Sequence, residues 1–353
     1  MSKCEHISWI EPQAGKAAPQ LVYGCRLARL VGELPDPSTQ LPQVVFFIGR
    51  REKNLALRQL CHSNYRGHHR YRTINLRSDN RTSHSSQPRF FADWDPTYRS
   101  LPPAFESPRI CHLEKVLPLE LSQTECSVFD FILSRLLFLF VDVLCVFADD
   151  VGGLESVREL LSGWTSIGSA SSLPRVSRPR VIVVAGDQTQ SVTHRVLDEE
   201  DFMFNLLHVS EIPFFAAFGE IQISRLPSAG LSPEARYITL GSEISRQLRK
   251  ARHIRERHRT LFSATHLNAF FELAVHNIST APMSSFNFIR SSRQQNPIDG
   301  AFTSHLVNFI NIGNRTRLPY DDMASHVASA ILMDAYPPGM HGTCIRVPLP
   351  YSQ

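Results

Sequence analysis

A glycine and a lysine in this sequence have the types and the order of a phosphate-binding turn. Gly49 directly follows the apolar run at 43–48, and Lys53 opens the amphipathic segment at 53–61. A chain that turns from a strand into a helix presents backbone N–H groups and a helix dipole to an anion, and a lysine placed there can bridge phosphates. The order of residues therefore suggests nucleotide phosphate binding with Mg²⁺.

The turn nevertheless departs from a competent phosphate loop, G-x-x-x-x-G-K-[ST], at three points. Only three residues separate Gly49 from Lys53, where the motif has five, and the two missing residues shorten the loop by about 7 Å of extended chain. Glu52 stands in the place of the second glycine, and a carboxylate about 4 Å from a phosphate charge is repelled by roughly 4 kcal/mol at an effective dielectric constant of about 20. Asn54 stands in the place of the hydroxyl that binds Mg²⁺.

Two later positions extend the comparison with a nucleotide site. In FFADWDP, Asp93 has the place of a metal-side aspartate, but Pro96 has the place of a glycine whose N–H would contact the γ-phosphate, and proline has no N–H. Asp187, after the apolar run at 178–186, has the place of a base-reading aspartate without the lysine that accompanies it. The candidate nucleotide-binding residues are Gly49, Lys53, Asn54, Asp93 and Asp187. We assign no catalytic residue and no metal ligand.

The segments that would position these residues alternate between apolar strands and helical patterns. We predict strands at 43–48, 71–76, 88–93, 141–148 and 178–186, and helices at 53–61, 125–140 and 152–164. Strands separated by helical segments predict a doubly wound, mainly parallel sheet. The predicted fold class is α/β, of degenerate P-loop NTPase type, followed by an α-helical C-terminal region.

Four regions are predicted along the chain. They are a poorly structured segment rich in proline, glycine and polar residues at 1–40, the α/β domain at 41–228, an α-helical extension at 229–341 and a tail at 342–353. Ser232 as N-cap and Pro233 at the first helical position open the extension.

The composition is that of a folded protein without a strong overall charge. The 353 residues are 42% hydrophobic, and the formal net charge of +4 is too small to predict nucleic-acid binding.

Seven scattered cysteines without a C-x-x-C pair are typical of a reducing compartment. Because the N-terminus also lacks an apolar signal segment, we expect a cytoplasmic protein. The most apolar run, 131–148, contains Arg135 and Asp142 and does not predict a transmembrane helix.

Two basic segments and one acidic pair have alternative interpretations. Ten Lys/Arg against two acids lie between Arg50 and Arg89, and the stretch 247–259 is similarly basic. We interpret both as solvated surface, and binding of nucleic acid or an anionic surface is the alternative.

Asp149 and Asp150 end the apolar run of a predicted strand. We interpret them as a solvated turn, with a functional carboxylate at this ligand-binding edge as the alternative.

The sequence also resembles a protein family. The stretches VVFFIGRREKNLALRQL, RFFADWDP, FVDVLCVFADDVGGLESVRELLSGW and RTLFSATHLNAFFELAVHN are similar to large fungal proteins with an N-terminal P-loop GTPase-like region, a helical segment and, in many, a C-terminal patatin-like phospholipase domain. The resemblance covers about residues 40–341. It implies that Lys53 matches the P-loop lysine and Asp93 the metal-side aspartate, while Asn54 and Pro96 differ from the family pattern. No G-x-S-x-G nucleophile occurs in the sequence, so we expect a truncated member.

These observations predict a pseudo-GTPase-like regulatory or interaction module with weak or no nucleotide hydrolysis, and not an enzyme. A functional nucleotide binder is the alternative, in which Lys53 bridges phosphates and Asn54 and Asp93 hold Mg²⁺. Mg²⁺ and GTP or ATP would be cofactors only in that case. The expected partner is an unidentified protein or effector domain, and nucleic acid is not favoured.

Overall fold

The chain forms two compact units, Met1–Phe286 and Asn287–Gln353. The computed structural model describes residues 7–16, 18–63, 72–97, 101–103, 114–120, 127–186, 199–209, 214–228, 230–258, 260–288, 291 and 300–335. The expected boundary near residue 228 falls inside the first unit, because the helix that follows it packs on the sheet of that unit.

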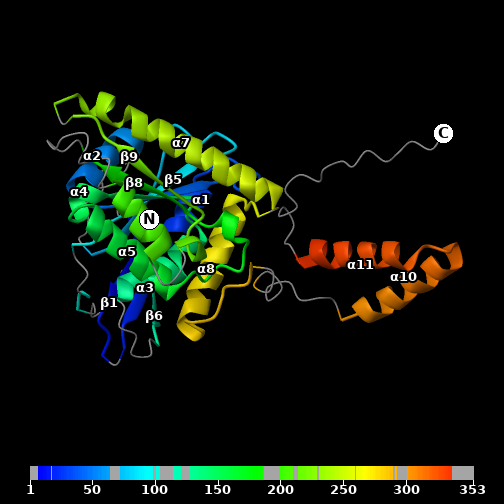
Figure 1. Ribbon diagram of the computed structural model, residues 1–353. Coiled ribbons are helices and arrows are strands. Elements are labelled where there is room, and N and C mark those ends of the chain that lie inside the picture. Colours follow the sequence, from blue (N-terminus) through cyan, green and yellow to red (C-terminus); the bar gives the residue numbers. More distant parts are fainter. Residues whose placement is uncertain are drawn as a thin grey trace, which may run out of the picture. The chain divides into compact units, whose positions relative to one another are not determined.

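The first unit is built on a sheet to which nine strands of the described residues belong (Figure 1). The strands are β1 (Ser8–Gln13), β2 (Gln20–Tyr23), β3 (Gln43–Ile48), β4 (Ile74–Ser78), β5 (Arg89–Trp94), β6 (Lys115–Pro118), β7 (Val143–Phe147), β8 (Arg180–Ala185) and β9 (Glu220–Arg225). Their order across the sheet is β6-β2-β1-β4-β5-β3-β7-β8-β9. Strands β5, β3, β7, β8 and β9 pair in parallel. Strands β4, β1, β2 and β6 continue the sheet with antiparallel pairs.

The predicted fold class was wrong. A doubly wound, mainly parallel sheet of degenerate P-loop NTPase type was expected, whereas the sheet is mixed and four of its strand pairs are antiparallel. The difference arises at β4, which pairs antiparallel with β5, and at β1, β2 and β6, where no strand was predicted. β1 and β2 lie within the predicted poorly structured segment 1–40, yet their apolar residues are buried. Pairing with β4 and β6 satisfies their backbone groups and extends the sheet beyond β5.

Helices cover both faces of the parallel half of the sheet (Figure 1). On one face α2 (Arg51–Leu60) and α7 (Pro233–Arg257) share a hydrophobic core with β3, β7 and β8, to which Leu57 and Leu240 belong. On the other face α3 (Val128–Arg135) contacts α5 (Leu154–Ile167), and Phe129 of α3 stacks on Trp94 with ring centroids 5.3 Å apart. Because both faces are covered, every residue of β3 and β7 is buried, as is usual for parallel strands.

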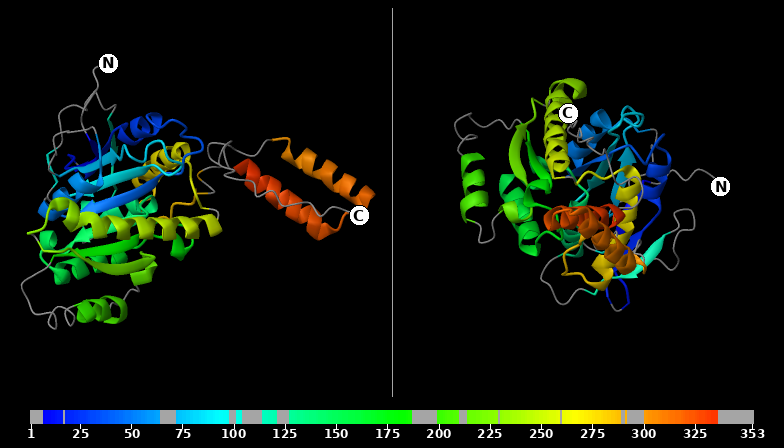
Figure 2. Two further views of the ribbon diagram at one scale, coloured as in Figure 1. Left: turned by 90° about the horizontal axis from the view of Figure 1, so that it is seen from above. Right: turned by 90° about the vertical axis from the view of Figure 1, so that its right-hand side faces the viewer.

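The antiparallel half is covered by two further helices, α1 (Arg26–Gly32) and α8 (Ala264–Thr280). Phe271 of α8 packs on Trp9 of β1 and Tyr23 of β2, with ring centroids 4.8 Å and 6.2 Å apart. α8 also lies beside α1 (Figure 2). These contacts give the N-terminal strands a core of their own.

The second unit contains the helices α10 (Phe302–Thr316) and α11 (Tyr320–Ala335), which contact each other. Met323 of α11 packs against Gly313 of α10, where a larger residue would clash with it. Most side chains of both helices are exposed. In the part of the chain that the structure describes, no helix has the length and apolar character to cross a bilayer.

Candidate functional site

The chain turns between β3 and α2, at the position where the sequence predicts a phosphate-binding turn. The N–H of Gly49 donates to the carbonyl of Trp94 at 3.1 Å, which ties the end of β3 to β5. α2 begins two residues later, at Arg51. The turn thus lies beyond the carboxyl ends of the parallel strands, the edge at which open α/β sheets bind ligands.

The carboxylate of Asp150 occupies this turn. Its Oδ2 accepts from the backbone N–H of Arg50 at 2.8 Å and of Lys53 at 2.9 Å, and its Oδ1 accepts from Arg51 at 2.9 Å and Glu52 at 3.0 Å. The first N–H groups of a helix have no acceptor within the helix and commonly bind an anion. Here the chain itself provides that anion.

Gly49 is the residue that allows the carboxylate to come so close. A Cβ atom at position 49 would lie 2.7 Å from Oδ2 of Asp150, and the backbone φ of +153° is one that other residues rarely adopt. The glycine predicted from the phosphate-loop pattern therefore makes room for a side chain of the protein.

Asp150 belongs to α4 (Ala148–Val151), a single turn of helix directly after β7. Asp149, on the same turn, accepts from the N–H of Gly186 after β8 at 3.0 Å. Gly152 and Gly153, with φ of +107° and +99°, end α4 and lead the chain into α5. In the sheet, β7 lies between β3 and β8. The two carboxylates of α4, which follows β7, therefore bind the chain on both sides: Asp150 accepts from the turn after β3, and Asp149 accepts from Gly186 after β8.

Lys53 and Asp93, two predicted site residues, lie together in the interior. Nζ of Lys53 is 2.9 Å from Oδ2 of Asp93, and the two side chains are 2% and 0% exposed. Asp93 also forms an ion pair with Arg77 and accepts from the side-chain amide of Asn75 at 3.3 Å. Buried charges are retained in proteins when they are paired in this way. The ammonium group expected to bridge phosphates is thus engaged in an internal ion pair.

Glu52 does not act on the turn in the way that the sequence predicted. Its Oε2 accepts from the hydroxyl of Tyr237 and pairs with Arg236, both on α7 and both at 2.9 Å. Burial, followed by the hydrogen bond to Glu52, raises the pKa of the Tyr237 phenol, which therefore stays a donor. The turn is closed by Asp150, and not by repulsion from Glu52.

Two further predicted site residues, Asn54 and Asp187, are not placed in a binding site by the structure. The side-chain oxygen of Asn54 is buried and has no hydrogen-bond partner among the described residues. Asp187 lies outside the described residues. Among the residues that the structure describes, no group of three His, Cys, Asp or Glu side chains is placed to hold a metal.

Asp150 is the residue whose role the sequence analysis missed. It was interpreted as part of a solvated turn, but it is half-buried and accepts four hydrogen bonds. A signal was present in the sequence. Two carboxylates directly after a fully buried strand, followed by two glycines, stand at the sheet edge where ligands bind.

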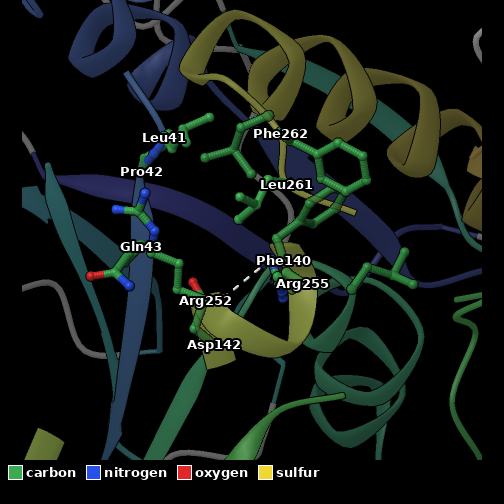
Figure 3. A pocket seen from close by; sticks show the side chains of 11 residues that line it. Leu41, Pro42, Gln43, Phe140, Asp142, Arg252, Arg255, Leu261 and Phe262 are labelled. Atoms are coloured by element: carbon green, nitrogen blue, oxygen red, sulfur yellow. Dashed lines mark ion pairs between the residues drawn. The ribbon is translucent and has the colours of Figure 1, made fainter. Parts of the chain in front are cut away.

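A small cavity lies at the opposite edge of the sheet, near the start of β3 and β7 (Figure 3). Asp142 in its wall accepts from the N–H of Val44 at 2.8 Å and pairs with Arg255 at 3.2 Å. Burial raises the pKa of the Asp142 carboxyl, and the charge of Arg255 opposes that shift. The cavity volume is about 20 Å³, which is room for a water molecule and not for an organic substrate.

No family model and no curated protein matches the chain. One solved structure that resembles it is that of the siderophore hydrolase EstA from Aspergillus nidulans, with 11% sequence identity and a TM-score of 0.27 over 70% of this chain and 95% of that chain. A TM-score this low does not establish a shared fold or activity. Nothing in these comparisons supports the P-loop NTPase type corrected above, and the resemblance to the fungal family stays a prediction.

Proposed function

We propose that this protein is a regulatory or interaction module with weak or no nucleotide hydrolysis. The observation that supports the proposal is the carboxylate of Asp150, which accepts from four consecutive backbone N–H groups at 2.8–3.0 Å. These are the groups that would have to bind a phosphate. A second negative charge cannot share them without displacing the first, since like charges at hydrogen-bond distance repel strongly.

The ion pair between Lys53 and Asp93 supports the same proposal. For Lys53 to bridge phosphates, and for Asp93 to act on a metal, their 2.9 Å contact in the interior would have to open. Breaking a buried pair costs about 3–5 kcal/mol. The alternative, a GTP- or ATP-binding protein with a remodelled loop, requires this rearrangement and the departure of Asp150 together.

The test is a nucleotide titration of the full chain. We expect no heat in calorimetry with Mg-GTP or Mg-ATP, no nucleotide released from the purified protein on denaturation, and no phosphate release above the buffer blank. Saturable nucleotide binding that is lost in Lys53→Ala would overturn the proposal in favour of the nucleotide-binding alternative. Asp149→Asn serves as the control variant, because it changes the neighbour of Asp150 on α4 without touching Lys53 or the four N–H groups.

We further propose that the protein resides in the cytoplasm. The cysteines at Cys25, Cys61 and Cys145 are free thiols, as is usual in a reducing compartment. A fluorescent fusion that is found in a secretory compartment would contradict this assignment.

A further inference from the structure

Three cations in the C-terminal half of α7, Arg246, Arg249 and Lys250, are exposed. Leu248 and Ala251, next to them in the sequence, are buried. Leu248 belongs to the core that α7 shares with the sheet. The cations therefore form a solvent-facing side of an amphipathic helix whose opposite side is fixed.

Two short helical turns carry exposed apolar side chains, and one of them contacts α7. α7 contacts η3 (Arg175–Ser177), and Arg178 after η3 donates to the carbonyl of Phe215 in η5 (Phe214–Ala216) at 3.4 Å. Val176 is 47% exposed and Phe215 is 49% exposed. The exposed Val176 thus follows the exposed Arg175 on the turn that contacts α7, and the exposed Phe215 lies on the turn that Arg178 holds.

The positive charges in this region are only partly compensated. Glu220, at the start of β9, pairs with Lys250 at 3.1 Å and also with the buried Arg180, so that one carboxylate serves two cations. Arg246 donates to the amide oxygen of Gln222, a neutral partner. Burial, and then the neighbouring cations Arg180 and Arg246, lower the pKa of Lys250. The region therefore has positive charge available for an acidic partner.

We propose that an acidic segment of another polypeptide, with an apolar or aromatic side chain between its carboxylates, docks on this surface. We define the docking surface as Arg175, Val176, Phe215, Arg246, Arg249 and Lys250. The proposal rests on the proposed function as an interaction module and names the class of partner. Arginine and aromatic residues dominate the energetics of protein interfaces, and complementary charge determines which partners are selected.

The composition of the docking surface favours a polypeptide over a nucleic acid. Single strands bind through several aromatic side chains on which successive bases stack, and Phe215 is the one aromatic residue of this surface. Duplexes bind through many cations along the phosphates, whereas Glu220 here lies within the basic face and Val176 adds an apolar contact. Nucleic acid binding is therefore an outcome to be tested against the proposal.

The test uses the full chain and a fluorescein-labelled synthetic peptide of alternating glutamate and phenylalanine, with fluorescence anisotropy as readout. We expect saturable binding that weakens about tenfold or more in Arg175→Glu/Arg249→Glu, and about tenfold in Phe215→Ala, because a lost hot-spot contact changes affinity by this factor. Arg315→Glu/Arg317→Glu is the matched control. It makes the same charge change at two exposed positions at the end of α10 in the second unit and should leave binding unchanged.

Circular dichroism and thermal denaturation confirm that each variant is folded before its affinity is compared. Absence of binding to the wild-type chain, or equal binding by wild type and both surface variants, overturns the proposal. Tighter binding of heparin or duplex DNA than of the peptide, with no effect of Phe215→Ala, overturns the assignment to a polypeptide. Nucleotide titration is independent of these results, so failure of the docking surface and failure of the proposed function give different outcomes.

Discussion

The contact most open to a quantitative test is the one between Asp150 and the first turn of α2. Substitution Asp150→Ala removes both carboxylate oxygens and leaves four backbone N–H groups without their acceptor. Alanine keeps the helical propensity of α4. The substitution therefore isolates the effect of the carboxylate on the turn.

The expected loss of stability follows from the exposure of the four bonds. The bonds from Arg50 and Arg51 are exposed, and water replaces the carboxylate there at little cost. The bonds from Glu52 and Lys53 are partly buried. At about 1.5 kcal/mol for each partly buried bond to a charged group, the free energy of unfolding should fall by about 3 kcal/mol. For the first unit, Met1–Phe286, the Tm should then fall by about 5 °C.

The assay is urea and thermal denaturation followed by circular dichroism, with Asp149→Ala as control. The control removes the acceptor of the Gly186 N–H and leaves the four N–H groups of the turn with theirs, and the loss of that bond should cost about 1 kcal/mol. Sulfate, compared with chloride at equal ionic strength, should restore part of the stability of Asp150→Ala and have less effect on the wild type, because an anion can bind the vacated N–H groups. A change below about 0.5 kcal/mol in Asp150→Ala would refute the argument, since a surface substitution without a structural role has that effect.

Three further predictions concern buried ionisable groups. Lys53→Met should destabilise the protein by about 3 kcal/mol in urea denaturation, because it leaves Asp93 with one cation fewer in the interior, and a variant as stable as wild type would contradict this. Burial raises the pKa of the Cys61 thiol to about 12, so at about pH 8 iodoacetamide should label Cys25 well before Cys61, and equal labelling by peptide mass spectrometry would contradict it. The raised pKa of Tyr237 means that its phenol stays protonated in the folded state at pH values above about 10, the usual pKa of tyrosine. In the unfolded state the phenol ionises at those pH values. The free energy of unfolding should therefore fall as the pH rises beyond about 10, and less steeply in Tyr237→Phe.

Much of the parallel half of the sheet could be predicted from the sequence. β3, β7 and β8 are continuous apolar runs, and such runs are what strands covered on both faces require. β1, β2 and β6 could not be predicted in this way. β2 and β6 have four residues each. β1 pairs with β2 nearby in the sequence, but the pairs β1–β4 and β2–β6 join segments far apart along the chain. The sequence pattern is local, whereas this pairing is not.

The candidate site shows the same limit. The positions of Gly49, Lys53 and Asp93 at the ends of strands could be predicted, because local order determines them. Their partners could not, because Asp150 is about a hundred residues away from the turn and Tyr237 is 185 residues away from Glu52. Which side chain fills a turn depends on the tertiary structure.

The single turn of α4 has a consequence for how the protein persists in a cell. Proteins that need a bound molecule to complete a loop gain stability that rises with the logarithm of the free concentration of that molecule. Here the acceptor is covalently part of the chain, so the loop stays formed at any metabolite level. The amount of folded protein should then be independent of energy status and of the nucleotide pool.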